Sequence, residues 1–322
     1  MKVSVLINNY NYADYVSACV QSVLAQTRLP DEIIVVDDGS TDGSVASIEQ
    51  KFSHEPLVKI IAKPNNGQLS AFNAGFRKSS GDLIFFLDAD DVYSEEYLAH
   101  AIDFYHGNPD CGFLYCAYEK FGRVHGVERA YSSDQDHGCS VLESLGFLYW
   151  RGGPTSTLSL RRSILEKILP LNLEGDWLLR ADDCLVHGAG VVGAHKYFLA
   201  KPLVRYRVHD RNAWYGRELS QADKVERVYR VNRLVGTLAR DCGYYVSTLP
   251  EHVHAEFASA GSGRNIHDLV RYLKIAARTH CGITWKMNQW ARLIATYARM
   301  LVPGRSRWKA TISNMDSGLS NG

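Results

Sequence analysis

Short apolar runs that end in polar residues recur along the first ninety residues and alternate with segments of helical periodicity. The runs are VSVLI (3–7), EIIVVDD (32–38), VKIIAK (58–63) and LIFFLDADD (83–91). They are rich in Val, Ile and Phe, as buried strands are. Strands that alternate with helices at this spacing form βαβ units, in which helices cover both faces of a mostly parallel sheet. The pattern therefore predicts an α/β fold with a mostly parallel central sheet.

Helical periodicity fills the gaps between these runs. Val16, Val20 and Val23 recur at helical spacing after Asp14, which suits a helix N-cap, and a later helix is expected over 68–79. In open α/β sheets, ligands bind beyond the carboxyl ends of the strands. We therefore expect one crevice lined by the polar strand ends NNYN (8–11), DDGS (37–40), KPNNGQ (63–68) and DADD (88–91).

The composition is that of a globular protein, with 46% hydrophobic and 22% charged residues among 322. The seven cysteines are scattered and form no CxxC pair, so neither a disulfide framework nor a zinc site is predicted. No apolar run reaches the roughly 18 residues that span a bilayer, and the first residues lack a signal-peptide pattern. We expect a cytoplasmic protein that is soluble or peripheral on the inner face of the cell membrane.

Three aspartates end the fourth run, namely Asp88, Asp90 and Asp91. A turn or cap explains one of them, but three neighbouring carboxylates repel one another unless a cation or donors compensate. Alternate residues of an extended segment point to the same side, so Asp88 and Asp90 can face one ion. The glycine-rich fingerprints of dinucleotide and P-loop sites are missing. Carboxylates suit Mg²⁺ or Mn²⁺ carrying a nucleotide diphosphate, which is the ligand this end of the chain favours.

Three motifs follow one another over about residues 3–95: VSVLINNYNYADYVSACVQSVLAQT, DEIIVVDDGSTDGS and NNGQLSAFNAGFRKSSGDLIFFLDADD. In this order they resemble the N-terminal signature of the family 2 inverting glycosyltransferases. A weaker block over 178–212, LLRADDCLVHGAG and KPLVRYRVHDRN, resembles the acceptor-side region of that family. The resemblance implies the Rossmann-like A-type glycosyltransferase fold, a nucleotide-sugar donor and a divalent cation, Mn²⁺ or Mg²⁺.

The resemblance also implies roles for residues of the donor side. Asn8 and Tyr10 fall where the family contacts the nucleobase, and Asp38 falls where it holds uracil or thymine and the ribose. Asp90 corresponds to the direct metal ligand. Asp88 corresponds to a ribose contact or a further metal contact.

On the acceptor side, the family takes its general base from a Glu-Asp pair at the start of a helix. The matching place here reads RADDCL, so the base is Asp182 or Asp183, and Asp183 aligns with the catalytic position. Because Asp176 lies nearby, the alignment of this segment with the Glu-Asp pair of the family stays open. An ionised aspartate in a cleft suits removal of the acceptor hydroxyl proton, whereas a helix N-cap is the structural alternative.

RYRVHDRN (205–212) alternates Arg207 and His209 on one side of an extended stretch. The resemblance implies that His209 completes the metal site and that Arg207 neutralises diphosphate charge. Packing roles are the alternative for both. We assign Asp91 to the same diphosphate or acceptor side, and Trp214 of the lid-like DRNAWYG loop to sugar stacking.

Charge divides the chain into an acidic front and a basic end. Residues 215–322 hold 16 Lys and Arg against 8 Asp and Glu, and residues 1–214 hold 20 against 27. Amphipathic patterns over 219–238 and 266–301 put basic residues beside Trp285 and Trp290. Two interpretations remain open for 215–310, an anionic membrane surface or packing on the catalytic part. Nucleic acid is not indicated, because no recognised module accompanies the charge.

We therefore expect a catalytic domain over 1–214, with a donor half (1–95) and an acceptor half (96–214), and a basic helical region over 215–322 with a disordered end. The predicted activity is inverting, metal-dependent transfer of one sugar from a UDP or dTDP donor to a glycan or lipid-linked glycan in bacterial surface polysaccharide synthesis. One alternative is a nucleotidylyltransferase, although INNYNYADY lacks the glycine and basic residues of its phosphate loop. The other is a catalytically inactive sugar-nucleotide-binding or scaffold protein.

Overall fold

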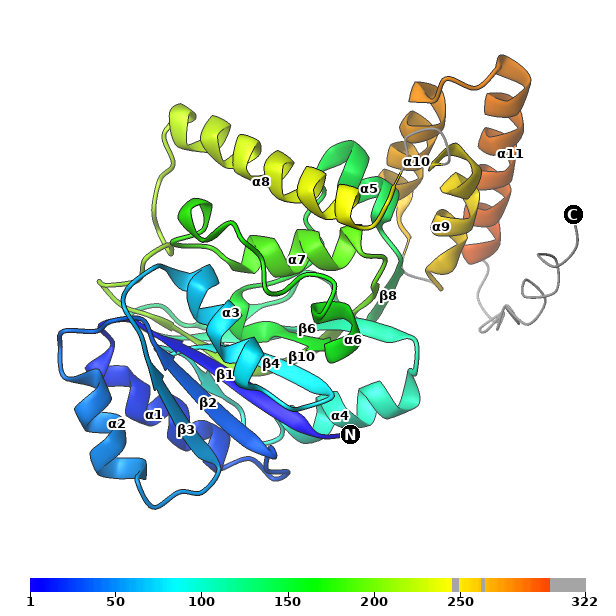
Figure 1. Cartoon of the computed structure of the whole chain (residues 1–322). Helices are drawn as coiled ribbons and strands as arrows, with labels where there is room; N and C mark the ends of the chain where they lie inside the picture. The colour runs from blue at the N-terminus through cyan, green and yellow to red at the C-terminus, as the bar shows by residue number, and fades with distance from the viewer. Residues whose placement is uncertain (245–248, 262–263, 302–322) are drawn as a thin grey trace, which may run out of the picture.

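One ten-stranded sheet runs through the computed structural model, which describes residues 1–244, 249–261 and 264–301 (Figure 1). Its strands are β1 (Val3–Asn9), β2 (Glu32–Asp37), β3 (Val58–Ala62), β4 (Leu83–Asp88), β5 (Val92–Tyr93), β6 (Cys111–Gly122), β7 (Gly126–Glu128), β8 (Gln135–Gly138), β9 (Leu158–Arg161) and β10 (His195–Val208). The order is β3-β2-β1-β4-β9-β6-β10-β5, with β7 beside β6 and β8 beside β10.

The four strands predicted in the front half are confirmed, and they lie side by side in parallel. The second half changes the character of the sheet. β9 runs antiparallel to both β4 and β6, and β5 and β8 run antiparallel to β10, whereas β6 and β10 are parallel. The sheet is therefore parallel from β1 to β4 and mixed over the later strands.

Helices cover both faces of the sheet, as predicted. One face carries α1 (Ala13–Leu24), α2 (Ser44–Phe52) and α4 (Tyr97–Gly107), and the other carries α3 (Gln68–Lys78), α5 (Val141–Phe147), α6 (Arg162–Leu165), α7 (Asp182–Val191) and α8 (Gln221–Asp241). Along β1, Val5 and Ile7 pack in the core under α1, whereas Leu6 packs in the core under α3. The strand is apolar on both sides because both faces are buried.

The predicted helix over 219–238 is confirmed as α8, and it packs on α7. Its buried side chains Val231, Leu234, Val235 and Leu238 belong to the same core as α7. We therefore propose to place the boundary of the sheet-containing domain after α8, and not at the expected 214/215 division.

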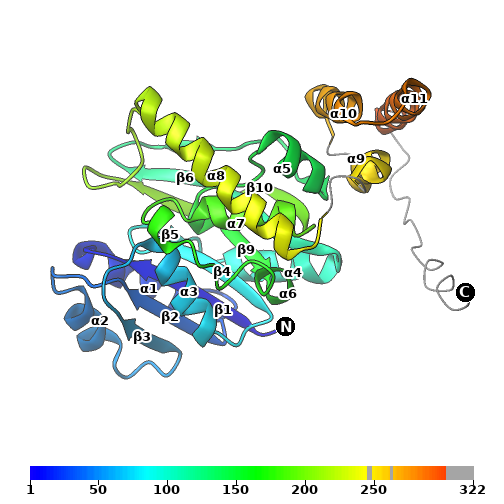
Figure 2. The same ribbon diagram turned by 45° about the horizontal axis from the view of Figure 1, so that its top comes forward.

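The remaining helices form a separate group at one end of the molecule, which we call the C-terminal bundle (Figure 2). It consists of α9 (Val253–Ser259), α10 (Ile266–Arg278) and α11 (Ile283–Met300), preceded by the turn η3 (Leu249–His252), and has a small core of its own that includes Leu142 of α5. The expected disordered end lies outside the described residues. Over the residues that the structure describes, no helix has both the length and the apolar character needed to cross a membrane.

Candidate active site

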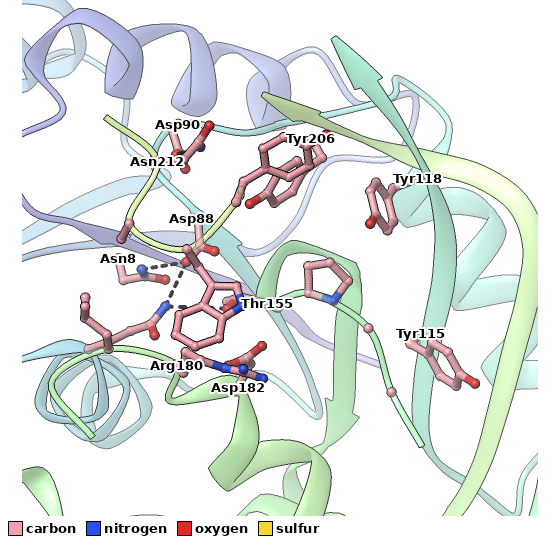
Figure 3. A pocket seen from close by; sticks show the side chains of 18 of the residues that line it. Asn8, Asp88, Asp90, Tyr115, Tyr118, Thr155, Arg180, Asp182, Tyr206 and Asn212 are labelled. Carbon is pink, nitrogen blue, oxygen red and sulfur yellow. Dashed lines mark hydrogen bonds between the residues drawn. The ribbon is translucent and has the colours of Figure 1, made fainter. Parts of the chain in front are cut away.

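A cleft of about 720 Å³ opens at the carboxyl ends of the parallel strands. The expected strand ends line one side of it: Asn8 to Tyr10, Asp38, Asn65, Gly67, Gln68, Asp88 and Asp90. The other side comes from later residues and includes Tyr115, Tyr118, Trp150, Thr155, Arg180, Asp182, Tyr206 and Trp214 (Figure 3). The cleft therefore brings together carboxylates from two distant parts of the chain.

Asp88 is the centre of the donor side. Its Oδ1 accepts hydrogen bonds from Asn8 Nδ2 at 2.7 Å and from Gln68 Nε2 at 3.0 Å (Figure 3). Burial raises the pKa of Asp88 to about 7, and the charge of Asp90 adds to the increase. Asn8 Oδ1 is buried and accepts no hydrogen bond from the described part of the chain. The Asp88 carboxylate would thus be stabilised by a nearby positive charge. Asn8 Oδ1 is able to accept a hydrogen bond from a ligand.

Asp90 and His209 lie together, as the prediction required of metal ligands. His209 Nε2 is 3.0 Å from Asp90 Oδ2, and Asn212 Nδ2 donates to the same oxygen at 3.2 Å. Carboxylate and imidazole are donors that Mn²⁺ accepts. Within residues 1–244, 249–261 and 264–301, however, no three His, Cys, Asp or Glu side chains are gathered as a preformed metal cluster. A cation at Asp90 would therefore take oxygens from its nucleotide or from water to complete its shell.

Asp91 and Arg207 lie behind the cleft rather than in it. Asp91 accepts from Ser156 Oγ at 2.6 Å and from the Arg207 backbone N–H at 2.7 Å. The Arg207 guanidinium lies over the rings of Tyr15 and Phe121, and its Nε donates to the Asp90 carbonyl at 2.7 Å. Both residues hold the loop that carries Asp90. Their placement gives no support to direct contact with the diphosphate.

Asp38 and Tyr10 occupy the outer part of the donor side. Asp38 lines the cleft, but its oxygens accept from the backbone N–H groups of Gly67 at 2.7 Å and Asn66 at 3.1 Å, and it also pairs with Lys63. It therefore shapes the 63–67 loop as well as facing the predicted nucleotide. Tyr10 stands at the edge of the cleft with 48% of its surface exposed, free to pack on a ligand.

The structure separates the two candidates for the base. Asp183 is fully buried, and its carboxylate accepts hydrogen bonds from Arg227 Nε at 2.9 Å and from Arg227 Nη2 at 2.7 Å. It does not line the cleft. Asp182 does line it. Burial raises the pKa of Asp182 to about 7, and the charge of Asp183 adds to the increase. Asp176, the third candidate, pairs with Arg233 of α8 outside the cleft.

Two residues of the cleft had been given no role from the sequence. Gln68 donates to Asp88 and accepts from the Ala181 backbone N–H at 2.8 Å, so it links the donor-side carboxylate to the start of α7. Its place in the quoted NNGQ motif was the available signal. Arg180 adopts a left-handed backbone with φ of 61°, and its guanidinium lies 4.2 Å from the ring of Trp214. No local sequence pattern indicates that conformation.

Comparisons with known proteins agree with this architecture. Residues 4–169 match the family model described as glycosyl transferase family 2. An uncharacterized glycosyltransferase of Nostoc sp. is 36% identical over 219 residues, which cover 66% of this chain and 66% of that protein. The chondroitin synthase of Pasteurella multocida is 42% identical over 89 residues, covering 28% of this chain and 9% of that protein.

The fold has solved counterparts. The crystal structure of Staphylococcus aureus TarS in complex with UDP-GlcNAc superimposes with a TM-score of 0.57 and 18% identity, and the match covers 93% of this chain and 90% of the TarS fragment. At that identity the likeness shows the fold alone. The family match over more than half of the sequence shows that this chain belongs to glycosyl transferase family 2 and is a glycosyltransferase.

Proposed function

We propose that the protein is an inverting, metal-dependent glycosyltransferase that moves one sugar from a nucleotide diphosphate sugar to an acceptor hydroxyl, with Asp182 as the general base. One observation carries the proposal. The donor-side carboxylates Asp88 and Asp90 line the same cleft as Asp182, whose carboxylate has no ion-pair partner among the described residues, and Gln68 contacts both sides. This arrangement supports a donor on one side and an attacking hydroxyl on the other.

The reaction uses Asp182 as a proton acceptor. As the acceptor oxygen attacks the anomeric carbon on the face opposite the diphosphate, its proton passes to the Asp182 carboxylate. The bond from the anomeric carbon to the diphosphate oxygen breaks, and the electron pair leaves with the nucleoside diphosphate. A carboxyl with a pKa of about 7 is ionised in about half of the molecules at neutral pH, and its ionised form is a stronger base than an ordinary aspartate.

The donor side fits a divalent cation and a nucleotide. Asp90, Asp88 and His209 would hold Mn²⁺ or Mg²⁺, and such a cation supplies Lewis-acid stabilisation of the leaving diphosphate. Asn8, Tyr10 and Asp38 remain our candidates for the base and ribose. The bound UDP-GlcNAc of the structurally similar TarS supports a UDP donor. A dTDP donor is also possible in chemical terms, because thymine presents the same hydrogen-bonding edge as uracil.

The acceptor side is rich in aromatic rings, which suit stacking on a sugar: Tyr115, Tyr118, Trp150, Tyr206 and Trp214. We therefore propose a glycan or lipid-linked glycan acceptor, as in bacterial surface polysaccharide synthesis in the cytoplasm. No feature of the described cleft favours a nucleotidylyltransferase. An inactive binding protein would have no need of an unpaired carboxylate at Asp182.

The donor site is tested by thermal unfolding of the wild type and Asp90→Ala with UDP, dTDP or GDP, each with and without Mn²⁺. We expect UDP or dTDP with Mn²⁺ to raise the midpoint, since a ligand at about 100 times its dissociation constant stabilises the folded state by about 2.7 kcal/mol. Asp90→Ala should lose the part of this increase in the unfolding midpoint that depends on Mn²⁺. The matched control is Asp103→Ala, an exposed acid of α4. The donor site would be refuted if no nucleotide shifted the midpoint, or if Asp90→Ala shifted like the wild type.

We further propose that the C-terminal bundle contacts an anionic membrane surface. Part of the basic face of α8 is engaged within the molecule, because Arg227 pairs with Asp183 and Arg233 pairs with Asp176. On α10 and α11, by contrast, apolar side chains are between 37% and 67% exposed: Ile266, Val270, Ile283, Met287, Trp290, Ile294 and Leu301. Residues 269–315 contain no Asp or Glu and nine Lys or Arg. An apolar helix face in an acid-free basic segment suits anionic lipid.

Sedimentation with lipid vesicles tests the membrane contact. The protein should pellet with vesicles that contain phosphatidylglycerol and not with pure phosphatidylcholine, and added salt should weaken binding. Met287→Glu combined with Ile294→Glu should abolish it, whereas Val225→Glu with Val228→Glu, on the exposed side of α8, should not. Equal binding by the two double variants would contradict the assignment. So would a soluble dimer that the α11 substitutions dissociate.

A further inference from the structure

A buried ion network joins the C-terminal bundle to the wall of the cleft. At its centre is Arg151, whose side chain is 1% exposed. Arg151 donates from Nε to Glu143 Oε2 at 3.0 Å and from Nη2 to Glu143 Oε1 at 3.1 Å. The same Nη2 donates to Asp268 in the first turn of α10. Because Glu143 belongs to α5 and Asp268 to the bundle, Arg151 holds both.

Two further arginines strengthen this connection from the bundle side. Arg264 Nη1 donates to Glu143 Oε2 at 3.0 Å, and Arg271 Nε donates to Glu143 Oε1 at 2.8 Å. The guanidinium groups of Arg151 and Arg264 lower the pKa of Glu143 to about 2, despite its burial. A buried charge that loses its partner is strongly destabilising. Moving the bundle away from α5 would therefore leave buried charges without their partners.

The same arginine reaches the cleft by two routes. Its chain neighbours Trp150 and Gly152 line the cleft directly. Its Nη1 also lies 3.4 Å from His137 Nδ1, and His137 Nε2 lies 2.9 Å from the hydroxyl of Tyr115, a cleft residue on β6 (Figure 3). Burial and the charge of Arg151 lower the pKa of His137 to about 2, so the imidazole is neutral. Since a guanidinium only donates, Nδ1 accepts and the proton sits on Nε2, facing Tyr115.

We propose that the C-terminal bundle, acting through Asp268 and Arg151, positions the aromatic wall of the cleft that Trp150 and Tyr115 form. Arg151 and Asp268 are positioning residues: the wall keeps its place because the bundle is docked. Calling this wall the acceptor side rests on the proposed function. The mechanical coupling between the bundle and the wall does not rest on the proposed function. Experiments can therefore refute the coupling and the proposed function independently.

Hydrogen exchange of the full-length protein, followed by mass spectrometry, tests the coupling with Asp268→Asn. The matched control is Asp223→Asn, because both aspartates are the third helical residue of a capping box, on α10 and α8 respectively, and only Asp268 contacts Arg151. We expect the amides of 149–153 and 113–117 to exchange about tenfold faster or more in Asp268→Asn, since local opening becomes easier. In Asp223→Asn they should exchange as in the wild type.

The outcomes separate a positioning role from a local structural one. Faster exchange confined to 249–301, or the same acceleration in both variants, would overturn the proposal. If Asp268→Asn does not fold, Asp268→Asn with Arg151→Gln removes both charges of the pair and avoids a lone buried charge. That double variant must still loosen 149–153, or the proposal is wrong. With an acceptor in hand, KM for the acceptor should rise while binding of UDP with Mn²⁺ stays unchanged. If the wild type did not bind UDP in the presence of Mn²⁺, the proposed donor site would be refuted, but the hydrogen-exchange result would still stand.

Discussion

Asp182→Asn is expected to reduce the rate of sugar transfer by about 100- to 10,000-fold, the usual contribution of a positioned general base. The amide cannot accept the proton of the attacking hydroxyl. Asp182 lines the cleft and has no charge partner as close as the Arg227 fork on Asp183. Binding of the nucleotide on the donor side should persist. Initial rates, measured beside calorimetric titration with the nucleotide, check both statements.

Asp183→Asn is the control. It removes the partner of Arg227 and should lower the free energy of unfolding, while the folded fraction still transfers sugar. If Asp183→Asn lost turnover and Asp182→Asn kept it, the base would be Asp183. The pH profile gives a second check. Because a protonated carboxyl cannot accept a proton, wild-type kcat should rise with pH through the pKa of Asp182, about 7, and this step should vanish in Asp182→Asn.

Asp88→Asn is expected to make the metal-free protein more stable at pH 8, by about 2 to 4 kcal/mol. The pKa of Asp88 is about 7 in the folded protein, against an ordinary value of 3.8. A carboxyl whose pKa is raised on folding contributes full stability below its unfolded pKa and loses it as the pH rises through its folded pKa. Ionisation at pH 8 therefore costs the folded state up to about 4 kcal/mol. Asparagine removes that cost and still accepts from Asn8 and Gln68.

Urea unfolding with a chelator present, at pH 8 and at pH 5, measures this effect. The gain from Asp88→Asn should shrink at pH 5, because the wild-type carboxyl is then largely protonated. An equal gain at both pH values would point to packing and not to charge. Mn²⁺ should reverse the order of the two proteins at pH 8, because the cation stabilises the wild type by binding its carboxylates.

The front half of the fold could be predicted from the sequence because its signals are local. Each of the first four strands is an apolar run with a polar end, and parallel strands place those ends at one edge. Asp88 and Asp90 were found for that reason. β9 has no such signal: it is four residues long and is placed by its two antiparallel neighbours, β4 and β6.

The acceptor side depends on contacts between distant residues. Asp182 and Asp183 are adjacent and chemically identical in the sequence. The contacts of Asp183 with Arg180 and with Arg227, 44 residues later, distinguish the buried aspartate from the one in the cleft. The pairs that Arg227 and Arg233 form account for part of the basic face of α8, which composition alone presented equally well as a membrane-binding face. Arg151 gave no signal either, because its partners Glu143 and Asp268 come from different parts of the chain.

The position of β9 in the sheet also has a consequence during protein synthesis. β4 ends at Asp88, but the strand that pairs with its second edge, β9, begins only at Leu158. At about 5 to 20 residues per second, a ribosome needs several seconds to make the chain between them. For that time the nascent donor half presents an unpaired edge of the apolar segment Leu83–Leu87, and such edges pair readily with other chains. Slow translation over residues 89–157 should therefore promote aggregation on the ribosome, and chaperones that shield strand edges should relieve it.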